Sequence, residues 1–460
     1  LTVGRVDTAS DKVGALVGPF AKGAVDLPIL VETEQDLLDN FGKPYSADKH
    51  YEYWMVASSY LAYGGPLRVV RADDDDLKNA FSGTAGSIKI KSTEHYNDLG
   101  YDGSTITGVT VAARNPGSWA NNLKVAIIDD LADQVLTFGS LPSNIQVGSG
   151  ITQTIPPNTV IAGSGSTSLL TGYFKGIVTE VDTTNKKVSV KILESVDTSG
   201  SAAGVSTEVS YQPNGIYKFG NTAVTVHNNS GIITGTGSPS GNADWFDQQA
   251  IQLTNTTINW NNIADRPGTS SFAEARNSRF DEVHVVVIDD TGEVTGNAGT
   301  ILEKHLALSK AKDGLYSLGS PSYWRKYVYN NSENIFAGGA PAGIVTTSLG
   351  IGTANFALSG DTGWDQNAQG IRFAGIGVTT LSLTGGKNYD GGTDETAAGA
   401  FQVTLAGLAG GYQLFEDDNL NSADFILMGS ANHQKEVCQS LANKIISVAE
   451  IRKDAVAFVS

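Results

Sequence analysis

Apolar and polar positions near the amino-terminal end form short runs with two different periods. Residues 13–18 and 28–31 are short apolar runs, which predict buried strands. Thr33 is placed to cap a helix, Asp36 can complete a capping box, and Gly42 can end the helix. This stretch therefore predicts two strands followed by a short helix.

The next segment predicts a second helix and a third strand. Residues 48–65 carry apolar positions at helical spacing and end in a glycine pair, and residues 67–72 (LRVVRA) form another apolar run. The apolar positions of the helix are Trp54, Ala57 and Leu61. Strand, helix, helix and strand in this order indicate an α/β layer.

The carboxyl-terminal end also shows a pattern typical of an α/β layer. Residues 432–454 predict a helix, and apolar runs flank it at 423–429 and 455–459. Its apolar face consists of Val437, Leu441, Ile445 and Val448. Two apolar strands on either side of a helix predict a crossover that joins parallel strands.

The centre of the chain differs from both ends in composition and pattern. Residues 129–229 are rich in Gly, Ser and Thr and show alternating strands, so we expect an inserted β-domain without helices. Within it, residues 172–195 predict a hairpin with its turn near Asp182–Asn185.

Mixed structure is predicted from residue 259 to residue 336. Residues 282–290 (EVHVVVIDD) predict a buried strand, residues 299–313 an amphipathic helix, and residues 322–331 another short helix.

Composition excludes several classes of function. The chain of 460 residues has 31 Lys and Arg against 48 Asp and Glu, a net charge of −17, which disfavours binding to nucleic acid or to an anionic membrane. Cys438 is the single cysteine, so neither an internal disulfide nor a cysteine-based zinc site can form. No apolar run approaches the length of a membrane span. Because the sequence starts at Leu1 and ends on an apolar run, we expect a piece of a longer protein.

Two acidic segments invite a calcium hypothesis. Four consecutive carboxylates at Asp73–Asp76 cannot easily surround one ion, so we interpret them as a solvent-exposed turn where the chain leaves a domain. Asp417, Asn419 and Asn421 have the spacing that starts an EF-hand loop. However, Ser422 and Met428 stand where glycine and glutamate are needed, so no metal site is expected.

The glycine-rich segment Leu383–Asp394 (LTGGKNYDGGTD) superficially matches a phosphate-binding loop. Leu381 and Asn388 occupy the positions of the required glycine and hydroxyl residue, so we interpret it as a turn. The histidines are scattered without a paired metal motif, and His284 lies inside a predicted strand. They are His50, His95, His227, His284, His305 and His433. Cys438 is expected to pack as an inert thiol. We therefore predict no catalytic, cofactor or metal residues and no enzyme activity.

Several segments, in their order along the chain, resemble the tail sheath proteins of contractile-tailed bacteriophages, most closely the T-even type. Ala120 stands where that family has a glycine after the tryptophan. The similar segments are residues 14–44 (strand, Gly-Pro-aromatic turn, helix ending in Phe-Gly), 51–72 (helix, Tyr-Gly-Gly turn, Arg-Val-Val-Arg strand), 111–127 (Pro-Gly and Trp before a strand), 381–391 (Gly-Gly turn) and 449–460 (Arg-Lys-Asp before a strand).

The resemblance implies a multidomain α+β and α/β fold with a discontinuous α/β domain from both chain ends. That sheath core domain would comprise residues 1–76 and 340–460, and a middle α+β domain residues 77–128 and 230–339. Residues 129–229 would form an inserted outer β-domain, an all-β barrel or sandwich. An N-terminal arm and a C-terminal domain would lie beyond this chain, which is then expected to be a monomer.

The resemblance also implies a structural role without cofactors. Copies of the protein would stack as six-fold rings around a tail tube protein, contact baseplate and tail terminator proteins, and contract during genome delivery. The location would be the virion tail, with assembly in the host cytoplasm, without nucleic-acid binding or membrane insertion. Alternatives are the sheath of a phage-like injection machine and, in another class, a β-rich glycan-binding or depolymerising tail protein.

Overall fold

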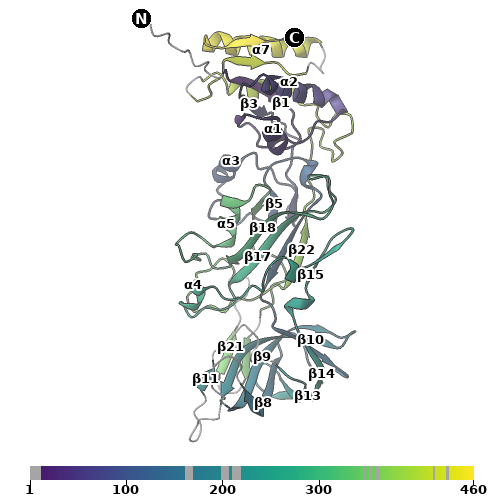
Figure 1. Ribbon diagram of the computed structural model, residues 1–460, viewed down its shortest axis with the longest axis vertical. Coiled ribbons are helices and arrows are strands. Elements are labelled where there is room, and N and C mark those ends of the chain that lie inside the picture. The colour runs from purple at the N-terminus through teal and green to yellow at the C-terminus, as the bar shows by residue number, and fades with distance from the viewer. Residues whose placement is uncertain are drawn as a thin grey trace, which may run out of the picture.

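In the computed structural model the molecule is a long body of three tiers (Figure 1). The structure describes residues 12–160, 169–197, 207–209, 219–346, 348–351, 354–357, 363–417, 420–430 and 435–459. We call the tier that holds both described chain ends the proximal tier, the opposite one the distal tier, and the part between them the middle tier.

The proximal tier is built on a five-stranded sheet to which both ends of the chain contribute. Its strands are β1 (Gly14–Gly18), β2 (Ile29–Val31), β3 (Leu67–Arg71), β23 (Phe425–Leu427) and β24 (Val456–Phe458). They lie in the order β2–β3–β1–β23–β24, and all neighbours are parallel except β2 and β3. The parallel crossover predicted for the carboxyl end is confirmed by the pairing of β23 with β24.

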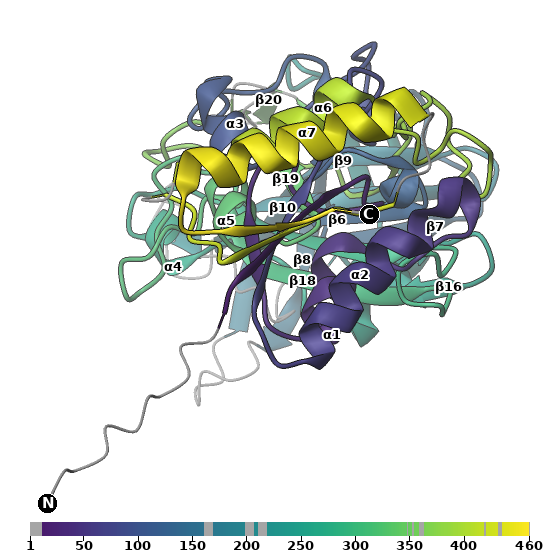
Figure 2. The ribbon, with the colours of Figure 1, turned by 90° about the horizontal axis from the view of Figure 1, so that it is seen from above.

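Helices cover both faces of this sheet (Figure 2). They are α1 (Glu34–Phe41), the short 3₁₀ helix η1 (Ala47–Lys49), α2 (His50–Ala62), α6 (Leu405–Gln413) and α7 (Lys435–Arg452). Leu16 and Val69 pack with α1 and α2, whereas Ala15, Val17 and Val70 pack with α6 and α7. A sheet buried on both faces explains why its strands are apolar at nearly every position.

The predicted start of α1 is confirmed in detail. The amide of Asp36 donates to Thr33 Oγ1 at 3.1 Å, and the amide of Thr33 donates to Asp36 Oδ2 at 3.0 Å. We expect Thr33→Ala to lower the free energy of unfolding by about 1 kcal/mol, because the Asp36 amide loses the Thr33 hydroxyl as its acceptor. Urea unfolding would measure this loss. Thr33→Ser, which keeps the hydroxyl, is the matched control and should stay close to the parent protein.

The middle tier contains three antiparallel sheets. Their strand orders are β18–β17–β6–β22, β19–β5–β4 and β15–β16. The elements are β4 (Phe81–Gly83), α3 (Thr93–Asp98), β5 (Val109–Ala113), η2 (Ser118–Ala120), β6 (Leu123–Asp129), η3 (Phe246–Gln248), β15 (Ala250–Gln252), β16 (Thr257–Asn259), η4 (Trp260–Asn262), α4 (Ser271–Glu274), β17 (Glu282–Asp289), β18 (Thr300–Ser309), α5 (Trp324–Asn331), β19 (Ile335–Ala337) and β22 (Val378–Ser382). The predicted buried strand over residues 282–290 and the predicted short helix over 322–331 are confirmed.

The amphipathic helix predicted over residues 299–313 is wrong, because this segment forms β18. Val283 and Val285 of β17 face Leu308 and His305, so β18 has an extra residue there. A second irregularity lies between Val287 and Ile288. Bulges of this kind interrupt the alternation of a strand and insert steps of three residues, which resemble helical spacing in sequence.

The distal tier is an eight-stranded sheet. It contains β7 (Gln134–Phe138), β8 (Gly150–Val160), β9 (Leu169–Asp182), β10 (Lys187–Asp197), β11 (Thr207–Val209), β12 (Val224–His227), β13 (Ile233–Gly237) and β14 (Pro239–Asp244), and the two-stranded sheet of β20 (Ser348–Ile351) and β21 (Ala354–Ala357) lies beside it (Figure 1). The predicted hairpin is confirmed by the antiparallel pair β9 and β10. No helix occurs in the described part of residues 129–229, as predicted.

The observed sheets do not follow the predicted domain boundaries at three places. β13 and β14 belong to the distal sheet although they lie beyond residue 229. Within 340–460, β22 pairs with β6 of the middle tier, and β20 and β21 lie beside the distal sheet. The structure is a mixed α and β fold with several sheets and few helices, and the division into domains stays a proposal.

Candidate functional site

The aspartate run at the end of β3 is held by protein groups. The ammonium groups of Lys89 and Lys91 lie 2.7 and 2.6 Å from the two carboxylate oxygens of Asp73. Asp74 is buried, and it accepts hydrogen bonds from the amides of Asp76 (3.2 Å) and Thr404 (3.3 Å). The interpretation as a solvent-exposed turn is therefore wrong for Asp73 and Asp74, because lysines and amides occupy their oxygens.

This cluster predicts a loss of stability in acid. Burial raises the pKa of the Asp73 carboxyl, but the ammonium groups of Lys89 and Lys91 outweigh burial and hold the pKa below its ordinary value. A lowered carboxyl pKa stabilises the fold above the unfolded-state value, near pH 4, and this contribution is lost as pH falls through the folded-state pKa. Urea unfolding between pH 7 and pH 2.5 should show a smaller acid-induced loss in Asp73→Asn. An unchanged acid limb in that variant would contradict the assignment.

In the two other segments that were weighed as ligand sites, described residues have contacts within the protein. Asn419 lies outside the described residues, and Asn421 donates to the Leu414 carbonyl at 2.8 Å. In the glycine-rich segment the amides of Gly386 and Lys387 donate to Asn121 (2.8 Å) and to the Lys78 carbonyl (3.0 Å), so they are not free for a phosphate. Among the described residues, no three His, Cys, Asp or Glu side chains are grouped as a metal site.

The described histidines have structural contacts. His50 stacks on Phe401 with centroids 4.1 Å apart, and burial, assisted by the charge of Arg71, lowers the pKa of its ring to about 3. His284 Nδ1 accepts from the Ala307 amide at 2.9 Å, which fixes one bulge of β18. His433 lies outside the described residues. Cys438 is partly buried on α7.

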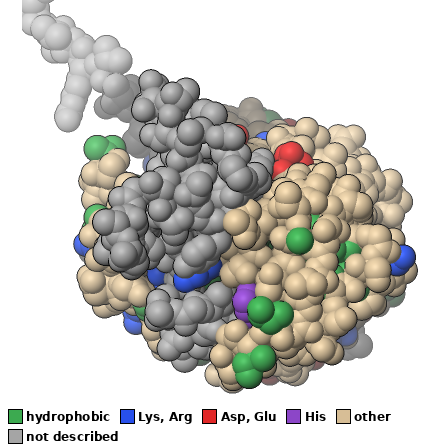
Figure 3. Space-filling view, turned by 90° about the horizontal axis from the view of Figure 1, so that it is seen from below, with side chains coloured by type: hydrophobic (Ala, Val, Ile, Leu, Met, Phe, Trp, Pro, Cys, Tyr) green, Lys and Arg blue, Asp and Glu red, His purple; other side chains and the backbone are tan. Residues whose placement is uncertain are grey.

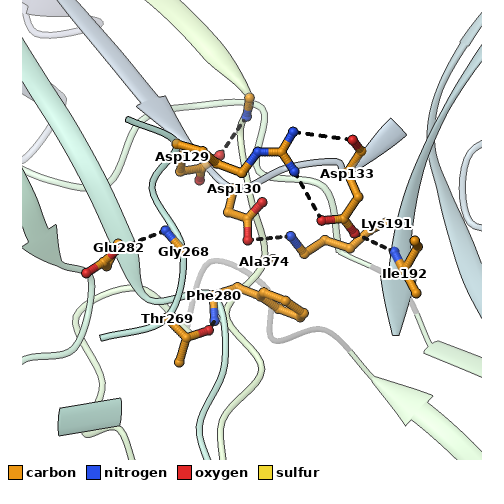
Figure 4. A network of polar contacts seen from close by, with 12 residues as sticks. Asp129, Asp130, Asp133, Lys191, Ile192, Gly268, Thr269, Phe280, Glu282 and Ala374 are labelled. Carbon is orange, nitrogen blue, oxygen red and sulfur yellow. Dashed lines mark hydrogen bonds and ion pairs between the residues drawn. The ribbon is translucent and has the colours of Figure 1, made fainter. Parts of the chain in front are cut away.

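The most extensive polar network lies at the junction of the middle and distal tiers (Figure 4). Asp129 ends β6, and its carboxylate lies 2.8 Å from the ammonium group of Lys310, at the end of β18, with both side chains fully buried. The Asp129 carboxylate also accepts hydrogen bonds from the amides of Ile376 (2.9 Å) and Gly377 (2.9 Å). Three segments distant in sequence therefore meet at one carboxylate.

Lys310 is bonded on its remaining sides as well. Its ammonium group donates to the carbonyls of Phe280 (3.1 Å) and Ala374 (3.2 Å) and lies 5.1 Å from the centre of the Trp364 ring. A buried ammonium group is tolerated only with such a set of acceptors. The pair therefore joins the end of β6, where the chain leaves for the distal tier, to the segment that returns from the distal tier to β22.

Asp130, the next residue, links the middle tier to the distal tier. Asp130 Oδ2 lies 2.7 Å from the ammonium group of Lys191 on β10, and both side chains are buried. The same ammonium group lies 3.8 Å from the centre of the Phe280 ring. Burial raises the pKa of the Asp130 carboxyl, although Lys191 opposes this shift. Within the described part of the chain, Asp130 Oδ1 has no hydrogen-bond partner.

Asp133 completes the connection. Its carboxylate accepts from the amide of Ile192 on β10 at 2.6 Å and lies 3.5 Å from the guanidinium group of Arg266. Arg266 also pairs with Asp244 at the end of β14. Carboxylates at 129, 130 and 133 thus bind the middle tier, β10 and β14 together, and the arrangement fixes the distal tier relative to the middle tier.

Polar contacts also join the proximal and middle tiers. The guanidinium group of Arg71 at the end of β3 donates to the carbonyls of Gly23 (3.0 Å) and Pro116 (2.7 Å). Lys91 pairs with Asp26 at 2.9 Å, and Lys43 lies 3.6 Å from Glu293. Arg71 is buried, whereas the Lys91–Asp26 and Lys43–Glu293 pairs are more exposed than the Asp129–Lys310 and Asp130–Lys191 pairs of the distal junction.

Our sequence reasoning singled out none of the residues of the distal junction. One signal was present in the acidic segment 129–133 (DDLAD), which follows the apolar run 125–128. Lys191 and Lys310 gave no signal, because a lysine among apolar residues is expected to reach solvent. None of the described helices is both long and apolar enough to span a membrane.

The distal end of the molecule has a weakly charged surface. Its described part consists mostly of uncharged polar side chains and backbone, with few charged groups (Figure 3). Ile232 and Ile233 are each 63% exposed there.

Comparison with known proteins gives partial matches to one kind of protein. No protein-family model matches the chain. A tail sheath protein of Enterobacteria phage T4 is 39% identical over 79 residues, which are 17% of this chain and 12% of that protein. A tail sheath protein of Salmonella phage ViI is 32% identical over 118 residues, which are 25% of this chain and 18% of that protein.

A solved structure of a sheath tail protein from Listeria innocua is 10% identical and covers 51% of this chain and 34% of its own, but its TM-score of 0.17 carries no argument. The matched segments span less than a fifth of each of the two phage proteins, at 12% and 18%. Both names denote a structural tail component and neither names an enzyme. Over these segments, the chain is similar to bacteriophage tail sheath proteins.

Proposed function

We propose that the chain is a structural subunit of a contractile phage tail sheath, which surrounds a tail tube and contracts to drive it through the host envelope during genome delivery. The observation that carries this proposal is the identity of 39% and 32% to two phage tail sheath proteins. The segments that resemble this family are spread from residue 14 to residue 460 and follow the same order along the chain.

The tiered body fits such a mechanical role. Contraction needs subunits that change their mutual packing while each remains folded. Buried ion pairs such as Asp129–Lys310 and Asp130–Lys191 hold the middle and distal tiers as one body. Both described chain ends lie in the proximal tier, where β1 and β24 belong to one sheet (Figure 2).

The proposed partners are further copies of the protein, in six-fold rings stacked as a helix, together with tail tube, baseplate and tail terminator proteins. The proposed location is the virion tail, after assembly in the host cytoplasm. Head-to-tail contacts between copies are heterologous, and a rotation combined with a rise produces a helical tube.

Electron microscopy of the complete protein tests this function. We expect hollow tubes or stacked rings of six-fold symmetry, with and without co-expressed tube protein. Discrete trimers that cleave glycans would contradict the proposal and support a depolymerising tail protein instead. If the protein forms tubes and its gene lies in an operon that encodes no phage capsid, we would assign it to a phage-like injection machine.

A further inference from the structure

A pocket of about 300 Å³ opens on the side of the middle tier, between α3, α5 and the loops that precede and follow them. Four tyrosines line it, namely Tyr96, Tyr101, Tyr323 and Tyr329. The ring of Tyr96 lies 5.5 Å from that of Tyr101 and 5.4 Å from that of Tyr329, centre to centre. Aromatic rings therefore form a continuous apolar wall large enough for one six-membered ring.

The charges at the pocket differ from those of the whole molecule. Three cations line it, Lys312, Arg325 and Lys326, against the two carboxylates of Asp102 and Asp313. The chain as a whole has a net charge of −17. Lys326 pairs with Asp102 at 2.8 Å on the rim. A local excess of positive charge in an acidic protein favours an anionic ligand.

Arg325 supplies an uncompensated charge at the base of the pocket. Its side chain is buried, with 7% of the residue exposed. Its Nε donates to the Ala337 carbonyl at 3.4 Å and its Nη2 to the Ser104 carbonyl, and its side chain also interacts with the hydroxyl groups of Tyr96 and Tyr323. All of these partners are neutral. No ion pair between described residues involves Arg325, whereas buried guanidinium groups are usually paired with carboxylates.

We propose that this pocket binds the carboxylate of an acidic sugar, a hexuronate, with the sugar ring against the tyrosine wall. A guanidinium group binds a carboxylate through two parallel hydrogen bonds, which an ammonium group cannot reproduce. On the rim, Lys312 and Lys326 can donate to hydroxyl groups, and Asp102 and Asp313 can accept from them. An aromatic acid without hydroxyls would leave these rim groups unused, so the pocket favours the sugar. This proposal is independent of the sheath function.

Isothermal calorimetry of the 460-residue chain with sodium D-glucuronate tests the proposal, with D-glucose and sodium benzoate as comparison ligands. We expect saturable binding of glucuronate that is at least about tenfold tighter than that of either comparison ligand. Arg325→Lys should raise the Kd for glucuronate about tenfold, since the bidentate contact is lost. Lys312→Ala should raise it several-fold, and Lys304→Ala, an exposed lysine of β18 outside the pocket, should leave it unchanged.

Absence of saturable glucuronate binding would overturn the proposal. Equal binding of glucose would do so as well, because the carboxylate would not be recognised, and tighter binding of benzoate would exclude the sugar. If Arg325→Lys does not fold, Lys312→Ala and Tyr101→Ala at the rim decide the question. An unchanged Kd in both of these variants would place glucuronate elsewhere on the molecule.

Discussion

Lys310→Met is expected to lower the free energy of unfolding by about 3–5 kcal/mol, the range for breaking one partner of a buried ion pair. The substitution keeps the length and most of the volume of the side chain, so it leaves little cavity. Among the described residues, Lys310 is the only cation that forms an ion pair with Asp129, and the substitution removes it. It also removes the ammonium donor from the Phe280 and Ala374 carbonyls, of which Ala374 keeps only the Trp364 indole N–H. A charge buried at 0% exposure cannot recover its hydration in the folded state.

Urea unfolding followed by tryptophan fluorescence measures this loss, since the Trp364 ring lies 5.1 Å from the ammonium group. Lys304→Met is the matched control, because Lys304 is exposed on the same strand and should change stability by no more than about 0.5 kcal/mol. Equal stabilities of the two variants would show that the buried pair does not hold the junction.

The proximal tier was the part of the fold that sequence patterns predicted well. There the determinants are local: Thr33, Asp36 and Gly42 define one helix, and apolar runs at β1, β3 and β23 form a sheet that is buried on both faces. Local signals of this kind are retained in the folded chain because the tertiary contacts agree with them.

β18 shows where a local pattern fails. Its spacing of apolar residues was compatible with a helix, and only the pairing with β17 decides that it is a strand. Ala307 has a positive φ of 51° at the bulge, where the His284 ring accepts its amide. That contact joins two strands, and no window of sequence around Ala307 contains it.

The candidate site was not predictable for a related reason. Asp129 and Lys310, or Asp130 and Lys191, are far apart in sequence, and each is an unremarkable charged residue by itself. Once such a pair is buried, it fixes the relative position of the elements that carry it, because charges without access to water must stay close to each other. For the run Asp73–Asp76 the sequence predicted a solvent-exposed turn. In the structure Lys89 and Lys91 neutralise Asp73.

The two tier junctions differ in burial, and this difference bears on the proposed mechanics. The distal junction contains ion pairs with exposed fractions of 0–5%, whereas the Lys43–Glu293 contact of the proximal junction has both side chains 52% exposed. Exposed pairs contribute little to stability and are readily exchanged with water. Under load, the exposed Lys43–Glu293 pair is therefore expected to break before the buried ion pairs of the distal junction, whereas the buried Arg71 contacts of the proximal junction should persist longer.

Lys191→Met is expected to loosen the distal tier from the middle tier and to lower the free energy of unfolding by about 3–5 kcal/mol. The variant leaves the Asp130 carboxylate buried beside Asp133 without the ammonium group 2.7 Å away. Loss of that charge should disturb the neighbouring hydrogen bond from the Ile192 amide to Asp133. Hydrogen exchange at Ile192 reports this event directly, and we expect its protection to fall.

The double variant Lys191→Met with Asp130→Leu separates charge from packing. Removing both charges replaces an ion pair with apolar volume, so most of the stability lost in the single variant should return. Lys187→Met, on the same strand but outside the junction, serves as the control for the loss of a lysine. If the double variant is as unstable as the single one, the contact of the Lys191 ammonium group with the Phe280 ring holds the tiers together, and the ion pair does not.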